Sequence, residues 1–193
     1  YYEAVRDWIL PHVKDRPLTL VRCPEGYQKD CFYQKHANDQ MPDVIGRVEV
    51  PADQGSACYT IAHSLEALLG LVQIGVLEIH TWGAKRDKLD RPDRMILDLD
   101  PGPAVDWSSV IEGVQLLRTL LRELNLTSFV KTTGGKGLHV VVPLQRVHTW
   151  DEVKTFSEAL AEHLERLIPE RFVATMSKAK RQGKIYVDYL RNA

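Results

Sequence analysis

"RMILDLDPG" (residues 94–102) joins an apolar run to a pair of acids and ends in Pro-Gly. In an extended strand, successive side chains point to opposite faces. One face would carry only apolar residues, and Asp98 and Asp100 would project together from the other. The Pro-Gly pair that follows is a typical turn signal. The segment therefore predicts a strand with one face in the core and two carboxylates on the other.

Two neighbouring carboxylates repel each other, and a divalent cation between them removes this cost. Asp98 and Asp100 are hard oxygen ligands of the kind that Mg²⁺ and Mn²⁺ prefer. The alternative is a solvated strand end with two surface acids. The pair by itself does not decide between the two interpretations.

The composition is that of an ordinary globular protein, with 193 residues, 44% of them hydrophobic, and a formal net charge of −1. This length suits one domain with a substantial core. The charge balance excludes a chain coated in basic residues, although local clusters can still bind phosphate. No apolar run approaches the roughly 20 residues of a membrane-spanning helix, and the first segment lacks a signal-peptide pattern. We therefore predict neither a membrane span nor export.

Three cysteines, Cys23, Cys31 and Cys58, form no C-x-x-C motif and leave one unpaired in any disulfide scheme. Such usage favours a reducing compartment. The three are too dispersed for a zinc module, so we expect no structural zinc and interpret them as packing residues.

Hydrophobic periodicity predicts helices and strands that interleave along the whole chain. Helices are expected over residues 1–14, 61–73, 107–124 and 150–168. Strands are expected over residues 18–23, 44–50, 76–82, 95–100, 127–132, 138–143 and 184–190. Without internal repeats or low-complexity linkers, this order predicts a single mixed α/β domain.

The segment KTTGGKGLHVVVPL (residues 131–144) places glycines and a lysine between two expected strands. Gly134 and Gly135 free the backbone for close approach to a ligand, so that successive N–H groups could cradle phosphate. Lys136 would add a positive charge. A Walker A loop is excluded, because Gly137 rather than Ser or Thr follows the lysine and a strand comes next. A glycine-rich hairpin turn is the alternative.

A third acid lies in a basic segment, MSKAKRQGKIYVDYLRN (residues 176–192). Five lysines and arginines oppose one aspartate, Asp188, and five minus one leaves a local balance of +4. Phosphate binding is the simplest use of such a patch. Strand alternation places Asp188 opposite an apolar row, so it could join Asp98 and Asp100 in a two-metal site. The alternative is an exposed loop in which Asp188 pairs with Arg191.

In order and spacing, five motifs resemble the polymerase domain of bacterial ligase D, a member of the archaeo-eukaryotic primase superfamily. The motifs are FYQKH (32–36), LEIHTW (77–82), MILDLDPG (95–102), TTGGKGLHV (132–140) and KIYVDYLRN (184–192). The resemblance implies an α/β primase-polymerase core over residues 1–193, with mixed and antiparallel sheets flanked by helices. It also implies that N- and C-terminal segments of the full domain lie outside this sequence.

The resemblance implies a nucleotidyltransferase that adds nucleotides, preferably ribonucleotides, to a DNA 3′-hydroxyl during double-strand-break repair by non-homologous end joining. Its cofactor would be Mn²⁺ or Mg²⁺ in a two-metal site, with a preference for manganese. Its partners would be gapped or 3′-overhanging DNA ends, nucleoside triphosphates, the Ku protein, and ligase and phosphoesterase domains, fused or separate. It would work in the bacterial cytoplasm, at the nucleoid.

The resemblance also implies roles for individual residues. Asp98, Asp100 and Asp188 would be catalytic metal ligands, with Asp188 holding the ion that activates the primer 3′-hydroxyl. The residues that would bind the nucleotide are His80, Thr133, Gly134, Gly135, Lys136, Arg181 and Arg191. The residues that would meet DNA are Phe32, Tyr33 and Lys35.

Purely structural interpretations exist for several of these positions. His80 alone reads as a solvent-facing strand residue, and Phe32 and Tyr33 as a pair of which one ring packs in the core. His139 reads as a core or supporting histidine, and we leave it outside the site.

Other functions compete with a polymerase. A phosphatase of the haloacid dehalogenase type uses a strand ending in D-x-D but expects Thr or Val where this chain has Gly102. A D-x-D glycosyltransferase leaves the glycine loop and Asp188 unexplained. A catalytically silent module that only holds DNA ends would retain three acids that repel phosphate unless metal is present.

Overall fold

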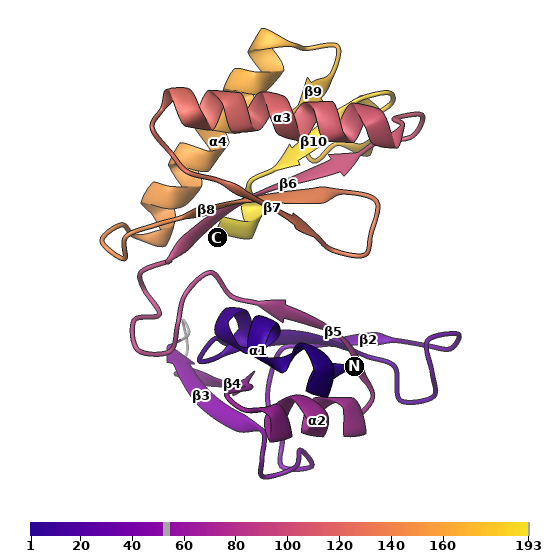
Figure 1. Ribbon diagram of the computed structural model, residues 1–193, viewed down its shortest axis with the longest axis vertical. Helices are drawn as coiled ribbons and strands as arrows, with labels where there is room; N and C mark the ends of the chain where they lie inside the picture. Colours follow the sequence, from indigo (N-terminus) through magenta and orange to yellow (C-terminus); the bar gives the residue numbers. More distant parts are fainter. Residues whose placement is uncertain (52–54, 193) are drawn as a thin grey trace. The chain divides into compact units, whose positions relative to one another are not determined.

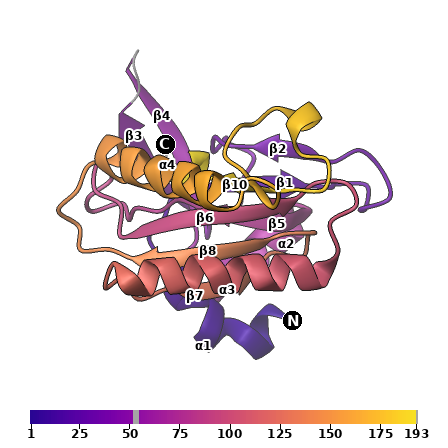
Figure 2. The ribbon, with the colours of Figure 1, turned by 90° about the horizontal axis from the view of Figure 1, so that it is seen from above.

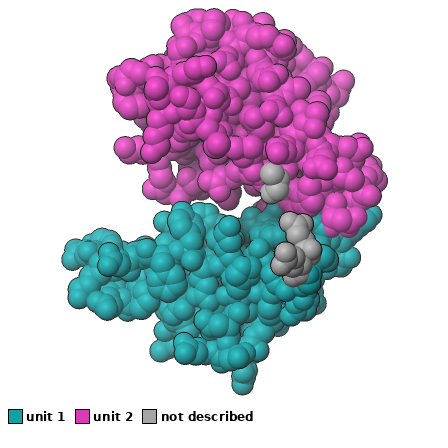
Figure 3. All heavy atoms as spheres, turned by 180° about the vertical axis from the view of Figure 1, so that it is seen from behind, with its two compact units in different colours: residues 1–89 teal, residues 90–193 magenta. Residues whose placement is uncertain are grey.

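The computed structural model describes residues 1–51 and 55–192 of the chain. The chain divides into two compact units, residues 1–89 and 90–193, which Figure 3 colours separately. Within the described residues, each unit has its own five-stranded sheet and its own apolar core. No helix in this part of the chain is both long and apolar enough to cross a membrane.

Unit 1 combines an antiparallel sheet with the helices α1 and α2. Its elements are α1 (Tyr2–Val13), β1 (Leu18–Arg22), β2 (Phe32–Gln34), β3 (Gly46–Pro51), β4 (Ser56–Ile61), α2 (Leu65–Gln73) and β5 (Val76–Thr81). Strand β1 pairs with β2, β4 and β5, and β3 pairs with β4. Leu18 and Leu20 of β1 share a fully buried cluster with Leu68 and Leu71 of α2.

Unit 2 is a mixed sheet with the helices α3 and α4 on one face (Figure 1). Its elements are β6 (Arg94–Pro101), α3 (Trp107–Glu123), β7 (Phe129–Thr132), β8 (Leu138–Pro143), α4 (Trp150–Leu167), β9 (Phe172–Val173), β10 (Ile185–Asp188) and two 3-10 helices, η1 (Lys178–Lys180) and η2 (Leu190–Asn192). The strand order is β7-β8-β6-β10-β9, antiparallel except for the parallel pair β10 and β9. The predicted α/β fold with mixed and antiparallel sheets and flanking helices is confirmed.

Strand β6 has the two faces that its sequence predicts. Met95, Leu97 and Leu99 are no more than 1% exposed and belong to one core cluster with residues of α3 and α4. Seen from above in Figure 2, both helices lie over this sheet. Asp98 and Asp100 are out of phase with the buried row, so they project from the face that the helices do not cover.

Local sequence explains where these helices begin. The Asp106 carboxylate accepts the N–H of Ser109 at the start of α3. Thr149 and Glu152 form a reciprocal capping box at the start of α4. Such caps satisfy backbone donors that would otherwise lack partners. Each helix then places its apolar side toward the sheet and closes the core behind the aspartates.

The periodicity analysis missed the strands β2, β4 and β9. β2 and β9 are only three and two residues long, and β4 has the mixed sequence SACYTI, so the alternation is weak. The helix predicted over residues 61–73 begins at Leu65, because Ile61 ends β4 and Ser64 caps α2 by accepting the N–H of Ala67.

Cys23 and Cys31 are joined by a disulfide, so the interpretation of both as packing residues is wrong. The connection between β1 and β2 brings their Cα atoms to 4.4 Å, which a separation of eight residues does not reveal. Cys58 is free and partly buried. The cysteine pattern therefore no longer supports a reducing compartment.

Asn192 ties η2 to β6. Its side chain is 1% exposed, accepts the N–H of Ile96 at 2.8 Å and donates to the Ile96 carbonyl oxygen at 2.8 Å. It also donates to Ser157 Oγ at 3.1 Å. Buried backbone groups need hydrogen-bond partners, and the Asn192 amide gives Ile96 the two bonds that a neighbouring strand would otherwise supply. The side chain thereby anchors the segment that includes the adjacent Arg191.

Replacing Asn192 by leucine should lower the free energy of unfolding by about 2–4 kcal/mol, because the N–H and C=O of Ile96 lose their buried partners. Urea unfolding followed by circular dichroism measures the change. Gln145→Leu removes an amide from an exposed position of the same unit and should change stability by less than about 0.5 kcal/mol. Equal effects of the two substitutions would contradict the role of Asn192.

Candidate active site

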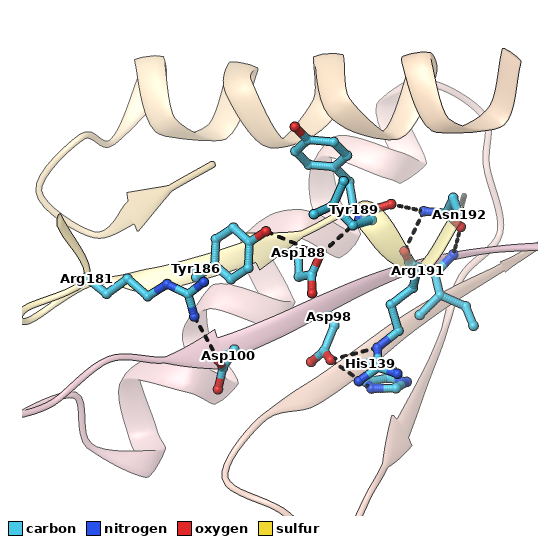
Figure 4. Close-up of polar contacts among 11 residues, drawn as sticks. Asp98, Asp100, His139, Arg181, Tyr186, Asp188, Tyr189, Arg191 and Asn192 are labelled. Atoms are coloured by element: carbon cyan, nitrogen blue, oxygen red, sulfur yellow. Dashed lines mark hydrogen bonds and ion pairs between the residues drawn. The ribbon is translucent and has the colours of Figure 1, made fainter. Parts of the chain in front are cut away.

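Three aspartates lie on the face of the unit 2 sheet opposite the helices. β10 runs antiparallel to β6, with Asp188 directly opposite Asp98 and Tyr186 opposite Asp100. Opposite residues on neighbouring antiparallel strands share a face, with Cβ atoms about 4.5–5.5 Å apart. Asp100 lies two residues along β6 and shares the same face. The structure thus brings the three predicted acids together (Figure 4).

Asp98 is held between two nitrogen donors, and its side chain is 14% exposed. Its Oδ2 lies 3.1 Å from His139 Nε2 and accepts a hydrogen bond from Arg191 Nε, also at 3.1 Å. Burial by itself would raise the pKa of Asp98, but the His139 hydrogen bond and charge and the Arg191 guanidinium outweigh it. The pKa of Asp98 is therefore held below its ordinary value, and the group is a carboxylate at neutral pH.

Asp100 is more open and pairs with Arg181. Arg181 Nη1 donates to Asp100 Oδ2 at 3.1 Å, and Nη2 donates to the carbonyl oxygen of Met176 at 3.0 Å. The guanidinium carbon also lies 3.8 Å from the centre of the Tyr186 ring, within cation–π range. Arg181 is therefore a fixed counter-charge beside Asp100.

Asp188 is oriented through one of its oxygens. Oδ1 accepts the N–H of Leu190 at 2.8 Å and the hydroxyl of Tyr186 at 3.3 Å. Burial and the adjacent charge of Asp188 raise the pKa of Tyr186, so its hydroxyl remains protonated and acts as the donor.

The donor set fits a hard divalent cation. The contacts above use Oδ2 of Asp98, Oδ2 of Asp100 and Oδ1 of Asp188, and the second oxygen of each acid has no such contact among the described residues. Carboxylate oxygens are the ligands that Mg²⁺ and Mn²⁺ prefer. Within residues 1–51 and 55–192, no three or more His, Cys, Asp and Glu side chains are already gathered around one point as a metal site. Arg181 and Arg191 instead supply the charge that balances two of the acids.

Two buried nitrogens border the acids without a hydrogen-bond partner in the described part of the chain. They are Nδ1 of His139 and Nε of Arg181. Buried polar atoms are nearly always paired with protein, water or ligand. Water or a bound polar group is the expected partner of each of these atoms.

The glycine loop joins β7 and β8 as an exposed hairpin. Residues 133–136 are all exposed, and Gly134 adopts a φ of 80°. Gly137 passes so close to β6 that a Cβ would lie 2.4 Å from the carbonyl oxygen of Leu99. Only glycine allows the loop to approach the strand that carries Asp98 and Asp100. This geometry is compatible with a phosphate cradle and equally with a simple hairpin turn.

The candidate residues of unit 1 lie on β2 and β5 and just beyond β2. Phe32 and Tyr33 are 48% and 69% exposed, so the interpretation in which one ring packs in the core is wrong. The Tyr33 ring centre lies 6.0 Å from that of His80, whose Nε2 lies 2.8 Å from Glu78 Oε2. Lys35 is exposed. Unit 1 thus presents an aromatic residue and a histidine side by side.

The sequence model of one family, described as the primase-polymerase domain of LigD, matches residues 1–193. The chain belongs to this family. The resemblance read from the five motifs is therefore confirmed, whereas the roles of individual residues stay predictions.

Curated relatives of this LigD primase-polymerase chain are longer proteins. The multifunctional non-homologous end joining protein LigD of Pseudomonas aeruginosa is 47% identical over 193 residues, which are 100% of this chain and 23% of that protein. The bifunctional non-homologous end joining protein LigD of Bacillus subtilis is 30% identical over 194 residues, 100% of this chain and 31% of that protein. The chain spans less than a third of the length of either relative.

A solved structure has the same fold as this LigD family member. It is the polymerase domain of Mycobacterium tuberculosis ligase D in complex with DNA. The TM-score is 0.91 at 30% sequence identity, and the match covers 100% of this chain and 70% of that one. This agreement confirms the primase-polymerase fold class.

The sequence analysis left two residues of the acid-bearing face, His139 and Tyr186, out of the site. His139 is 6% exposed and contacts Asp98, so it borders the site from which it was left out. Both residues interrupt apolar runs, in residues 138–140 and 185–187. The alternation that marked the aspartates could have placed them on the same face, because each is out of phase with a buried row.

Arg191→Gln should raise the pKa of Asp98 toward its ordinary value, because burial favours the neutral acid once the guanidinium charge is gone. A carbon-detected NMR titration of the Asp98 carboxyl measures the shift. Arg118→Gln, an exposed substitution on α3, is the matched control. An Asp98 titration that is the same in Arg191→Gln as in the wild type would refute this assignment.

The same substitution should change the pH dependence of stability. A lowered folded-state pKa means that Asp98 stabilises the fold at neutral pH and that this contribution is lost as pH falls through the folded-state value. In Arg191→Gln, this contribution should be smaller, and its loss should be complete at a higher pH than in the wild type.

Proposed function

We propose that this chain is a metal-dependent nucleotidyltransferase that adds nucleotides to a DNA 3′-hydroxyl during repair of double-strand breaks by non-homologous end joining. One observation carries the proposal: Asp188 lies opposite Asp98 on the neighbouring strand, and Asp100 shares their face. Three carboxylates on one face of neighbouring strands could supply the ligands of a two-metal site. We further propose that the two units work as one domain over residues 1–193.

Asp98, Asp100 and Asp188 would hold Mn²⁺ or Mg²⁺, with Asp188 nearest to the primer end. Bound there, the ions would lower the pKa of the attacking hydroxyl and stabilise the charge of the triphosphate. His139 and Arg191 keep Asp98 ionised, which prepares it for a cation. Asp98 would therefore be ready to bind a cation before substrate arrives.

The incoming nucleoside triphosphate would lie against the basic groups around the acids. Arg181 and Arg191, which pair with Asp100 and Asp98, would contact phosphate oxygens. The loop formed by Thr133, Gly134, Gly135 and Lys136 would contribute backbone N–H groups, a hydroxyl and a charge. His80 would also contact the triphosphate.

The reaction would be an in-line attack of the DNA 3′-hydroxyl on the α-phosphorus. A new P–O bond forms to the 3′-oxygen, the bond from the α-phosphorus to the bridging oxygen breaks, and pyrophosphate leaves. The hydroxyl proton passes to solvent. The basic side chains proposed to contact the triphosphate would stabilise the charge that builds up on the departing pyrophosphate. They are Arg181, Arg191, Lys136 and His80.

Phe32, Tyr33 and Lys35 would meet the DNA end. Exposed aromatic rings stack on bases and contribute on the order of 1–3 kcal/mol per base. The exposure of Phe32 and Tyr33 supports this role. Lys35 would contact the phosphate backbone.

The curated relatives are described as multifunctional and bifunctional end-joining proteins, and the solved neighbour is a complex with DNA. We infer the same setting here: gapped or 3′-overhanging DNA ends, the Ku protein, and ligase and phosphoesterase domains, in the bacterial cytoplasm at the nucleoid. Ribonucleotides and manganese would be preferred.

A catalytically silent module that binds DNA ends is the second candidate. The observation that favours it is the pairing of Asp98 and Asp100 with arginines, which balances both acids without metal. Mn²⁺-dependent extension of a primer by one ribonucleotide supports the polymerase. Binding of a 5′-phosphorylated end without any extension supports the silent module.

Asp98→Ala should reduce nucleotide incorporation to below about 1% of the wild-type rate, since charge stabilisation by the bound ions is lost. Gel-based extension of a fluorescent primer measures incorporation, and fluorescence anisotropy should show DNA binding within about threefold of wild type. Glu170→Gln, which removes an exposed charge after α4, is the control and should remain active. Normal extension by Asp98→Ala would show that the site lies elsewhere.

A further inference from the structure

Tyr186 lies between Asp188 and Arg181, the partner of Asp100, on the acid-bearing face. It lies on β10 opposite Asp100, is 2% exposed, and is two residues from Asp188 on the same face of the strand. Figure 4 shows its ring between Arg181 and Asp188. The proposed function gives it no role, and a buried aromatic ring here would by itself be ordinary core packing.

The hydroxyl of Tyr186 makes a contact that core packing does not require. It donates to Asp188 Oδ1 at 3.3 Å, the oxygen that also accepts the N–H of Leu190 at 2.8 Å. Two donors on one oxygen restrict rotation of the carboxylate. Oδ2 of Asp188 is then the oxygen that remains for a ligand.

The ring of Tyr186 makes a second specific contact. The Arg181 guanidinium lies 3.8 Å from the ring centre while Nη1 of Arg181 bonds Asp100. One side chain therefore touches Asp188 directly and Asp100 through its arginine partner. A phenylalanine would preserve the ring contact and the packing and would remove only the bond to Asp188.

We propose that Tyr186 is a positioning residue that orients Asp188 for the cation it shares with Asp98. The inference rests on the proposed function, because it concerns the same three acids. Groups that hydrogen-bond to metal ligands orient them, and their loss typically weakens metal binding by about 10–100-fold. We expect the lower end of that range here, because the Leu190 N–H still holds Asp188 after the hydroxyl is removed.

The test is Mn²⁺ binding to the 193-residue chain without nucleotide or DNA, followed by the electron paramagnetic resonance signal of free Mn²⁺. Tyr186→Phe should weaken binding about tenfold, equivalent to about 1.4 kcal/mol. The matched control is Tyr189→Phe, which removes a hydroxyl that bonds Glu158 at 2.6 Å, and it should bind as the wild type does. Tyr186→Leu, which also removes the ring, should bind no better than Tyr186→Phe.

Primer extension separates positioning from a general packing role. In Tyr186→Phe the Mn²⁺ concentration for half-maximal rate should rise about tenfold, while the rate at saturating Mn²⁺ returns to within about twofold of wild type. A packing defect would instead lower the melting temperature and the saturated rate together, and that result would overturn the inference.

The outcomes distinguish this inference from the proposed function. If the wild type binds Mn²⁺, Asp188→Ala abolishes binding and Tyr186→Phe binds like the wild type, Tyr186 has no positioning role and the three-acid site stands. If the wild type itself does not bind Mn²⁺, the proposed function and this inference are both overturned.

Discussion

The pairing register between β6 and β10 places Asp188 directly opposite Asp98, and the organisation of unit 2 depends on this juxtaposition. Like charges on opposite positions of an antiparallel pair destabilise the sheet unless other charges balance them. The surroundings meet that requirement, since Arg191 and His139 contact Asp98 and Arg181 contacts Asp100. Because clustered acids destabilise a sheet, the counter-charges that surround them here indicate that the cluster serves a function.

The rest of unit 2 supports the register. The apolar row of β6 is buried beneath α3 and α4, so a slip by one residue would turn the aspartates into the core. Asn192 bonds both backbone groups of Ile96 and so anchors the segment that carries Arg191. The same anchoring holds the backbone of Arg191 beside the strand that carries Asp98. The contacts that fix the position of β6 therefore also help to fix the charged groups around Asp98.

Much of the fold could be predicted because alternation and helical spacing are local properties. The strand β6 and the helix α4 follow directly from such patterns, and the motifs identified the family. The pairing partners of a strand are not local, so neither the Asp98–Asp188 register nor the arginine contacts could be read from the sequence. The Cys23–Cys31 disulfide was missed for the same reason, because it depends on the path of the chain between β1 and β2. His139 was set aside because an isolated histidine in an apolar run more often packs than contacts an acid.

Anomalous X-ray diffraction from crystals of the chain grown with Mn²⁺ tests the metal site most directly. We predict an anomalous peak ligated by carboxylate oxygens of Asp98 and Asp188, with Asp100 contributing to the same ion or to a neighbouring one about 3.5–4 Å away. A manganese peak elsewhere on the molecule, with the three carboxylates still paired only with arginine, histidine and tyrosine, would contradict the two-metal interpretation.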